Sequence, residues 1–114
     1  MKVGQYATVE RSYKSEDVDN FGRLIQDFNP LHSSSSSSTS STLVHGIFVS
    51  SIFSSMFANI APGCVYINQS LDFISPIFVH DIIIGCISIE KIRRRRSGDG
   101  IVVQCQTRVY KYKD

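Results

Sequence analysis

The alternation of apolar and polar residues predicts the order of the secondary-structure elements. Near the N-terminus, residues 3–14 are rich in β-branched and aromatic side chains, which is typical of a strand. Apolar residues then recur at the spacing of one helix face, and they predict an amphipathic helix over residues 16–27 with Ser15 as its N-cap. Pro30 disfavours helical geometry at Asn29, so this helix should end there.

A long apolar stretch in the middle of the chain predicts a central helix. Residues 43–61 are apolar nearly all round, with small Ser, Gly and Ala residues interleaved, and Pro62 and Gly63 follow them. The length of the stretch favours a helix over a strand. A helix that is apolar on every side is normally surrounded by other structure, so we expect this helix to be cradled by a sheet.

Three further segments have strand character. Residues 64–74 alternate between apolar and polar positions, residues 78–92 are rich in Ile with Gly85 as a candidate bulge, and residues 101–112 alternate again. Residues 97–100 (SGDG) between the last two segments indicate a hairpin turn. The pattern therefore predicts an α+β fold in which a curved antiparallel sheet wraps one long helix.

Composition narrows the class of protein. The chain of 114 residues, with 42% hydrophobic and 19% charged residues, matches one folded domain over residues 1–114. Residues 33–42 contain only Ser and Thr and predict a flexible low-complexity loop. The formal net charge of +2 is too small to indicate nucleic-acid binding, so we expect no nucleic-acid partner.

The cysteines and the N-terminal sequence give evidence on the cellular compartment in which the protein works. The three cysteines form no CxxC pair, which argues against a disulfide framework or a zinc knuckle and favours a reducing compartment. No apolar run reaches the ~18 residues of a membrane span, and no targeting segment is visible. We therefore expect no membrane partner and a location in the cytoplasm or the mitochondrial matrix.

The first candidate for chemistry is the segment from Asp27 to His32. An acid and an imidazole lie five residues apart across a rigid Asn29–Pro30 turn, and such a pair can bind one water and accept its proton. At a helix C-terminus the dipole disfavours a carboxylate by ~0.3–1 kcal/mol, and such local conflicts are common at functional sites. The alternative is that Asp27 and His32 only cap and brace the turn.

The second candidate is the start of the central helix at Val44-His45-Gly46. A helix N-terminus presents free N–H groups, and Gly46 allows a ligand close to the backbone, so an oxyanion can develop here. The alternative is a packing glycine under the sheet. Further along the helix, Ser54 is a candidate to face a cavity and orient a polar group, whereas His45 reads as structural. No spacing of His, Cys and carboxylate residues indicates a metal site.

A run of four arginines, Arg93–Arg96, lies beside the hairpin turn. Such a run usually forms a solvated strand end that protects a sheet edge, and the alternative is a phosphate-binding site. We include Arg93 and Arg94, together with Asn29 and His45, as candidate substrate contacts.

Taken together, these motifs resemble the MaoC-like (R)-specific enoyl-CoA hydratases over about residues 15–110. The resemblance rests on Asp27-x-Asn29-Pro30-x-His32, Val44-His45-Gly46, Ser54 and residues 66–73 (YINQSLDF). It implies the hotdog fold, in which a long helix is wrapped by a curved antiparallel sheet. It also implies hydration of trans-2-enoyl thioesters to (R)-3-hydroxyacyl thioesters, or the reverse dehydration, by a homodimer. No cofactor is implied beyond the CoA or pantetheine arm that carries the substrate.

The resemblance also assigns roles to individual residues. Asp27 and His32 match the family's catalytic dyad, which holds and deprotonates the water. Gly46 matches the glycine whose N–H polarises the thioester carbonyl and stabilises the enolate. Ser54 matches a serine that helps to orient the dyad, and Asn29 supports the turn.

The sequence departs from the family pattern in its Ser/Thr run, which replaces a segment that carries acidic and aromatic residues in the family. The family also usually continues into one more strand after the position of Asp114. Two alternative functions belong to other classes. An acyl-CoA thioesterase generally needs a carboxylate near the central helix, and residues 43–61 contain none. A non-catalytic hotdog binding module would not need both Asp27 and His32.

Overall fold

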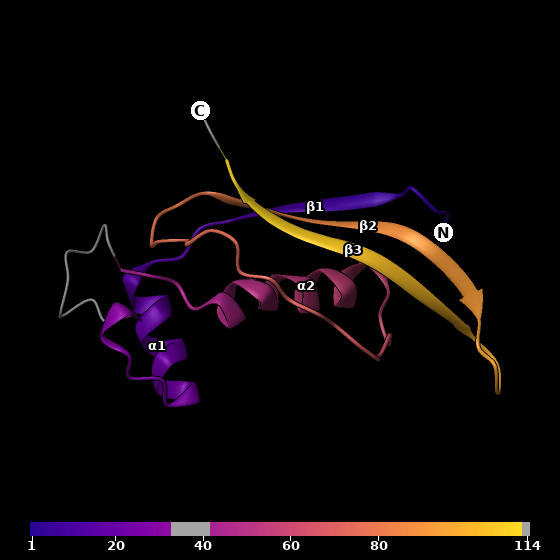
Figure 1. Ribbon diagram of the computed structural model, residues 1–114, viewed down its shortest axis with the longest axis horizontal. Coiled ribbons are helices and arrows are strands. Elements are labelled where there is room, and N and C mark those ends of the chain that lie inside the picture. The colour runs from indigo at the N-terminus through magenta and orange to yellow at the C-terminus, as the bar shows by residue number, and fades with distance from the viewer. Residues whose placement is uncertain (33–41, 113–114) are drawn as a thin grey trace.

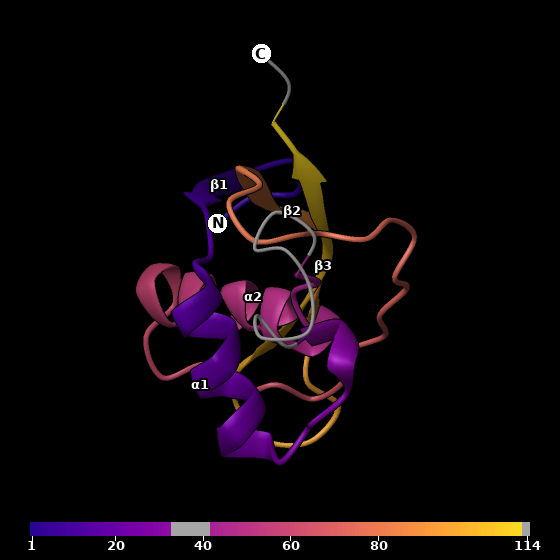
Figure 2. The ribbon, with the colours of Figure 1, turned by 90° about the vertical axis from the view of Figure 1, so that its left-hand side faces the viewer.

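A computed structural model describes residues 1–32 and 42–112, and its elements follow the predicted order except that the strand expected over residues 64–74 is not formed (Figure 1). Within these residues, an antiparallel sheet arches over one long helix, and a second helix crosses near one end of it (Figures 1 and 2). The elements in chain order are β1 (Tyr6–Arg11), α1 (Ser15–Ile25), η1 (Pro30–His32, a 3-10 helix), α2 (Gly46–Ile60), β2 (Ile83–Arg94) and β3 (Ile101–Lys111).

The sheet has the order β1-β2-β3 with antiparallel pairing throughout. The hairpin predicted at residues 97–100 is confirmed, because Arg95 N–H donates to the Gly100 carbonyl at 3.2 Å. Gly98 and Gly100 have φ values of 79° and 111°, a left-handed region in which glycine carries no Cβ penalty. These two glycines therefore fix where β2 reverses into β3.

The bulge predicted at Gly85 is wrong. Gly85 pairs in regular register with both neighbouring strands, and the register shift lies between Ile89 and Lys91. The glycine serves packing instead, since a Cβ at this position would lie 2.7 Å from Ile52 Cγ2 on α2. Gly85 therefore lets the helix approach the sheet closely.

The core lies between α2 and the concave face of the sheet. One face of α2 buries Val49, Ile52, Phe53 and Met56 against Ile83 and Ile87 of β2 and Val18 of α1. The opposite face is open in a single copy, where Ile47, Ser51, Ser54 and Ser55 are exposed. The helix is therefore shorter than the predicted 43–61, and it is not covered on every side as its composition suggested.

The ends of α1 differ slightly from the prediction. The N-cap is Lys14, not Ser15, and the Lys14 backbone N–H donates to Asp17 Oδ2 at 2.9 Å. The helix ends at Ile25, and Gln26 follows in the left-handed conformation with φ 61°. Asp27 consequently lies just beyond the helix, where the chain turns.

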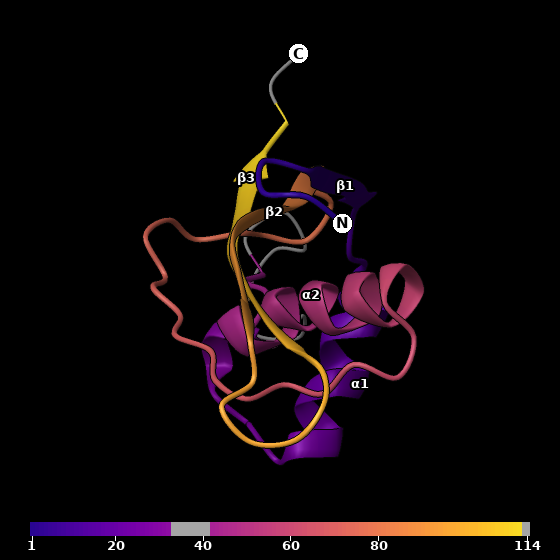
Figure 3. The same cartoon turned by 90° about the vertical axis from the view of Figure 1, so that its right-hand side faces the viewer.

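The strand predicted over residues 64–74 is not formed among the described residues. The segment is irregular and largely exposed, with Val65, Ile67 and Ile74 at 83%, 77% and 91% exposure. It runs on the β3 side of the molecule (Figure 3). No described strand pairs with it, so its alternating apolar and polar side chains do not lie on the two faces of a sheet.

Two remaining segments correct the loop predictions. Residues 78–82 form a turn ahead of β2 rather than the start of a strand, and Asp81 Oδ2 accepts the Phe78 N–H at 2.9 Å. Thr42 is fully buried instead of belonging to a flexible loop, while the rest of the Ser/Thr run lies outside the described residues. Across the described part of the chain, no helix combines the length and apolar character needed to cross a membrane.

Candidate active site

Local hydrogen bonds fix the turn that carries Asp27. Its backbone N–H donates to the Gly22 carbonyl at 2.9 Å and thereby continues the closure of α1. Its side-chain Oδ1 accepts the Asn29 N–H at 3.1 Å, and Asn29 Oδ1 in turn accepts the Leu31 N–H at 3.1 Å. The Asn29 side chain therefore closes part of the turn, and Asp27 Oδ2 stays free of these bonds.

His32 is held by the chain that leads into α2. Its Nδ1 lies 2.7 Å from the Leu43 carbonyl, and the Leu43 N–H donates to the Leu31 carbonyl at 2.9 Å. A carbonyl oxygen only accepts, so the proton of this bond resides on Nδ1. The neutral ring therefore has its lone pair on Nε2.

Two proton acceptors consequently face each other. His32 Nε2 lies 3.8 Å from Asp27 Oδ2, and the two side chains are 13% and 36% exposed. This distance is too long for a direct hydrogen bond. A single water that donates one O–H to each acceptor satisfies both groups, and its oxygen lone pairs remain available to a reaction partner.

His45 lies against this pair, although it comes from the start of α2. It is 3% exposed, its Nε2 is 3.8 Å from Asp27 Oδ2, and its ring stacks on that of His32 with centroids 3.9 Å apart. Neither ring nitrogen of His45 has a hydrogen-bond partner in the described part of the chain. Burial, followed by the neighbouring His32, lowers the pKa of His45, and the Asp27 carboxylate opposes this shift only in part. His45 is therefore neutral near pH 7.

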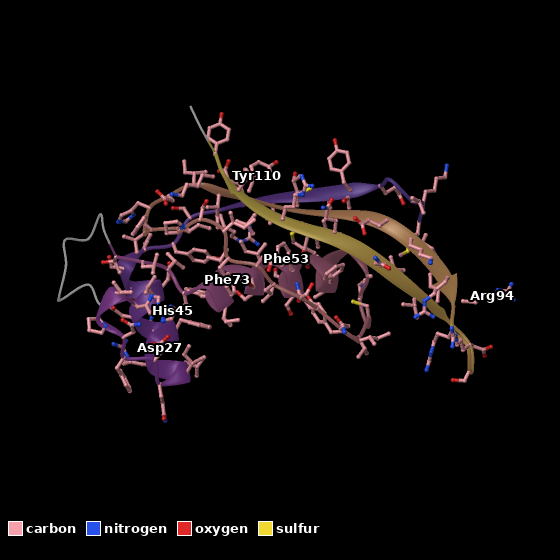
Figure 4. The ribbon with its side chains drawn as sticks, in the orientation of Figure 1. Asp27, His45, Phe53, Phe73, Arg94 and Tyr110 are labelled. Atoms are coloured by element: carbon pink, nitrogen blue, oxygen red, sulfur yellow. The ribbon has the colours of Figure 1, made fainter. Side chains whose placement is uncertain are left out.

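Gly46 begins α2 beside these groups. As the first residue of the helix it has an N–H without an intrahelical acceptor, and none is recorded elsewhere among the described residues. The Phe73 ring covers its Cα, since a Cβ on Gly46 would lie 2.6 Å from Phe73 Cε1. Gly46 and Phe73 line the same cleft as Asp27, His32 and His45. Figure 4 shows Asp27, His45 and Phe73 toward the end of the molecule opposite Arg94.

The structure does not bring Ser54 to this cluster. Ser54 lies two turns along α2 from Gly46, is exposed, and is not part of the cleft lining. The serine of α2 that lines the cleft is Ser50, whose hydroxyl donates to the Gly46 carbonyl at 2.8 Å. In a single copy, a role for Ser54 in orienting the dyad stays a prediction.

Arg93 and Arg94 also lie apart from the dyad. They are exposed at the far end of β2, and Figure 4 shows Arg94 at the end of the longest axis opposite to Asp27 and His45. That axis measures 51 Å. Within one copy, these arginines therefore cannot contact the same reacting atoms as the dyad.

The fold assembles a group of metal-type ligands that the sequence spacing did not indicate. Ligand atoms of Asp27, His32 and His45 all lie within 4.8 Å of one another. The two imidazole planes are only 19° apart, however, so their in-plane lone pairs run side by side instead of converging on one ion. The arrangement suits a bridging water better than a metal.

Sequence reasoning missed the contacts that His45 and Phe73 make here. Both come from segments distant along the chain from Asp27, and no local pattern reports such contacts. One signal was present, because His45 occupies the N-cap position of α2 without making a side-chain cap. An imidazole at a position that favours Ser, Thr, Asp or Asn suggests that the residue has a function other than capping the helix.

Comparisons with known proteins identify the family of this chain. The sequence model of the family described as MaoC like domain matches residues 2–110. A mitochondrial 3-hydroxyacyl-[acyl-carrier-protein] dehydratase of Arabidopsis thaliana is 34% identical over 97% of this chain and 68% of its own. An (R)-specific enoyl-CoA hydratase of Aeromonas caviae is 29% identical over 96% of this chain and 84% of its own.

Solved structures show the same fold. The (R)-hydratase from A. caviae involved in PHA biosynthesis superposes with a TM-score of 0.83 at 28% identity, and covers 97% of this chain and 86% of that one. The expected α+β hotdog architecture is thereby confirmed. Because the family model matches residues 2–110 and the A. thaliana relative is 34% identical over 97% of this chain, the chain belongs to the MaoC-like domain family.

Proposed function

We propose that this chain is a hydro-lyase that adds water to trans-2-enoyl thioesters, giving (R)-3-hydroxyacyl thioesters, or that runs the reverse dehydration in fatty-acid metabolism. The observation that carries the proposal is the opposed pair of acceptors, Asp27 Oδ2 and His32 Nε2, 3.8 Å apart beside the cleft. The names of the A. thaliana and A. caviae relatives describe the two directions of this reaction.

The pair activates the water that it binds. The water donates one hydrogen bond to Asp27 and one to His32. Its oxygen then forms a bond to the β-carbon of the enoyl group as one of its protons is transferred to the pair. The electrons of the carbon–carbon double bond move onto the thioester as an enolate. The proton held by the pair is then delivered to the α-carbon, so that one water has been added and the pair is restored.

The start of α2 stabilises the charge that develops on the thioester oxygen. The N–H of Gly46 has no acceptor within α2, and Gly46 lines the cleft at the positive end of the helix dipole. A donor that is already oriented costs no reorganisation when the enolate forms. Gly46 is therefore proposed as the oxyanion donor, with its N–H rather than a side chain as the functional group.

The carrier of the acyl group is CoA or the pantetheine arm of a carrier protein. Arg93 and Arg94 are too far from Asp27 in one copy to touch the acyl end, so they are proposed only as contacts for an anionic carrier away from the reacting atoms. The compartment is proposed to be the cytoplasm or the mitochondrial matrix, and the second is supported by the name of the plant relative.

We also infer that the working unit is a homodimer. The segment after α2 exposes Val65, Ile67, Phe73 and Ile74 by 62–91%. Large apolar side chains that gather in one exposed segment often mark an interface with another protein. A second copy that covers this segment would also close the open side of the cleft that residues 64–74 line.

The function is tested with crotonyl-CoA as substrate, by the loss of absorbance of the conjugated thioester. Asp27→Asn is nearly isosteric but cannot take a proton, so the rate should fall by about 10²- to 10⁴-fold. Asp99→Asn, in the exposed hairpin loop, is the matched control and should retain the wild-type rate. Equal rates for wild type and Asp27→Asn, or a silent wild type, would contradict the proposal.

The same reaction separates the alternative functions. A thioesterase would release a free thiol from crotonyl-CoA, which a thiol reagent detects, whereas hydration leaves the thioester intact. The described α2 helix contains no Asp or Glu, which argues against thioester hydrolysis. A binding module would bind crotonyl-CoA and would change neither the absorbance of the conjugated thioester nor the amount of free thiol.

A further inference from the structure

The buried imidazole of His45 is not used by the mechanism proposed above. It is 3% exposed, and both of its nitrogens lack a hydrogen-bond partner in the described part of the chain. Leaving a buried polar group unpaired is costly in free energy, so such a group needs a physical explanation. An apolar ring at this position would avoid that cost if His45 served only to fill space.

The surroundings of His45 orient its ring closely. Phe21 of α1 meets it edge-on with centroids 5.0 Å apart, and His32 stacks on its other side at 3.9 Å. Gly22 of α1 packs beside the ring, since a Cβ there would lie in ordinary contact with His45 Nε2 at 3.5 Å and more tightly against the Asp27 carbonyl oxygen at 3.1 Å. The ring is thus held between α1 and the catalytic imidazole.

The electrostatics select one tautomer of this ring. Only Asp27 and His32 among the described titratable groups act on it, while α1 and α2 contribute the uncharged Phe21, Gly22 and Phe48. Its Nε2 points toward Asp27 Oδ2 at 3.8 Å. A proton on Nε2 is attracted by the carboxylate, whereas a lone pair there would be repelled. The neutral ring should therefore carry its proton on Nε2.

We propose that His45 is a positioning residue, whose stacked ring holds His32 and whose Nε2–H, directed at Asp27 Oδ2, keeps both acceptors at the spacing that one bridging water requires. The proposal rests on the hydratase function inferred above and deepens it. His45 touches neither the water nor the acyl chain in this account, so its earlier assignment as a substrate contact is replaced. Its loss should lower kcat and leave KM nearly unchanged.

Two substitutions separate the two parts of this role. His45→Phe keeps an aromatic ring to stack on His32 but removes the donor, while His45→Asn keeps a donor but removes the ring. Small displacements of catalytic groups cost up to about 100-fold in rate, so each variant should lose about 10- to 100-fold in kcat. His80→Asn is the matched control, because His80 is exposed, adopts φ 70°, and lies outside the cleft lining.

Coupling to Asp27 provides a readout that a purely structural role would not move. Adding His45→Phe to Asp27→Asn should lower kcat little further, because His45 acts only through an intact pair. In contrast, a general loss of stability would lower the rate by the same factor in both backgrounds. If His45→Phe does not fold, His45→Asn carries the same test, and adding it to Asp27→Asn should likewise lower kcat little further.

A spectroscopic measurement tests the proposal without relying on activity. Long-range ¹H–¹⁵N NMR spectra of the full chain should show His45 protonated on Nε2 and His32 protonated on Nδ1. A His45 proton on Nδ1, an unchanged kcat in both His45 variants, or a rise in KM alone would overturn the proposal. An inactive wild type would instead refute the hydratase function, and the tautomers would still be readable.

Discussion

At the scale of single residues, the site depends on which atom of each ring carries a proton. The Nδ1–H of His32 donates to the Leu43 carbonyl at 2.7 Å, which leaves Nε2 as an acceptor opposite Asp27. His45 lies against both groups and has a lowered pKa, caused first by burial and then by His32. Two stacked imidazoles 3.9 Å apart repel each other strongly when both are charged. The two rings are therefore not both charged in the folded protein, and the lowered pKa makes His45 the neutral one.

The lowered pKa of His45 predicts how stability depends on pH. The pKa of His45 is lower in the folded protein than its ordinary value of 6.5 in the unfolded chain. As the pH falls below 6.5, the unfolded state therefore binds more protons than the folded state. Stability should consequently decrease as the pH falls through that value toward the pKa of the folded protein. Urea midpoints at about pH 7.5 and about pH 5 measure this loss.

The variant His45→Phe should lose less stability than wild type over that pH interval, since the buried titrating group is gone. His80→Asn, which removes an exposed histidine, should keep the wild-type dependence. An identical pH dependence in wild type and His45→Phe would show that His45 does not carry the effect.

At the scale of elements, the fold depends on how closely α2 packs under β2. Gly85 lies where a Cβ would meet Ile52 Cγ2 at 2.7 Å, and Val9 Cγ1 and Met56 Sδ lie 3.4 Å and 3.5 Å from the same point. The helix also carries His45 and Gly46 at its first turn. Its distance from the sheet thus sets where these groups stand relative to the turn at Asp27.

Replacing Gly85 with valine should destabilise the protein by about 1–3 kcal/mol, because the added methyl groups overpack the contact with Ile52. Gln106→Val is the control, as it adds a β-branched side chain at an exposed position of β3. Urea unfolding measures both free energies. Equal stabilities for wild type and Gly85→Val would refute the close contact between α2 and β2.

The elements also show what a sequence pattern can and cannot predict. The first helix, the central helix and the β2–β3 hairpin were predicted because their signals are local: apolar periodicity, Pro30, and glycines at the turn. The strand over residues 64–74 failed although its alternation is clear, since a strand needs a neighbour and none of the described strands pairs with it. Gly85 was misassigned for a similar reason, because its role depends on Ile52 in another element.

At the scale of the whole molecule, the dyad and the arginine run occupy opposite ends of a body 51 Å long (Figure 4). Asp27 and His32 could be found from the sequence because five residues and one turn separate them. His45 could not be added to them in the same way, because the fold alone brings it to the pair. The exposed apolar segment after α2 likewise becomes visible only in the assembled chain.

That exposed segment predicts self-association. The mass measured by sedimentation equilibrium should be that of two copies. Ile74→Asp should shift the equilibrium toward one copy, because Ile74 is 91% exposed in a single copy and a second copy that covered this position would bury an unpaired carboxylate. Asp19→Asn on α1 gives a control of altered charge away from the segment. A wild-type mass of one copy at every concentration would contradict the homodimer.

The central claim is that Asp27 and His32 act as one unit on one water. The direct test is a double-mutant cycle on crotonyl-CoA hydration with Asp27→Asn, His32→Asn and the double variant, each checked for folding by circular dichroism. If the two groups share one water, the double variant should be no slower than the more impaired single variant by more than a small factor. If the two losses multiply, or if either single variant keeps the wild-type rate, the shared-water account is contradicted.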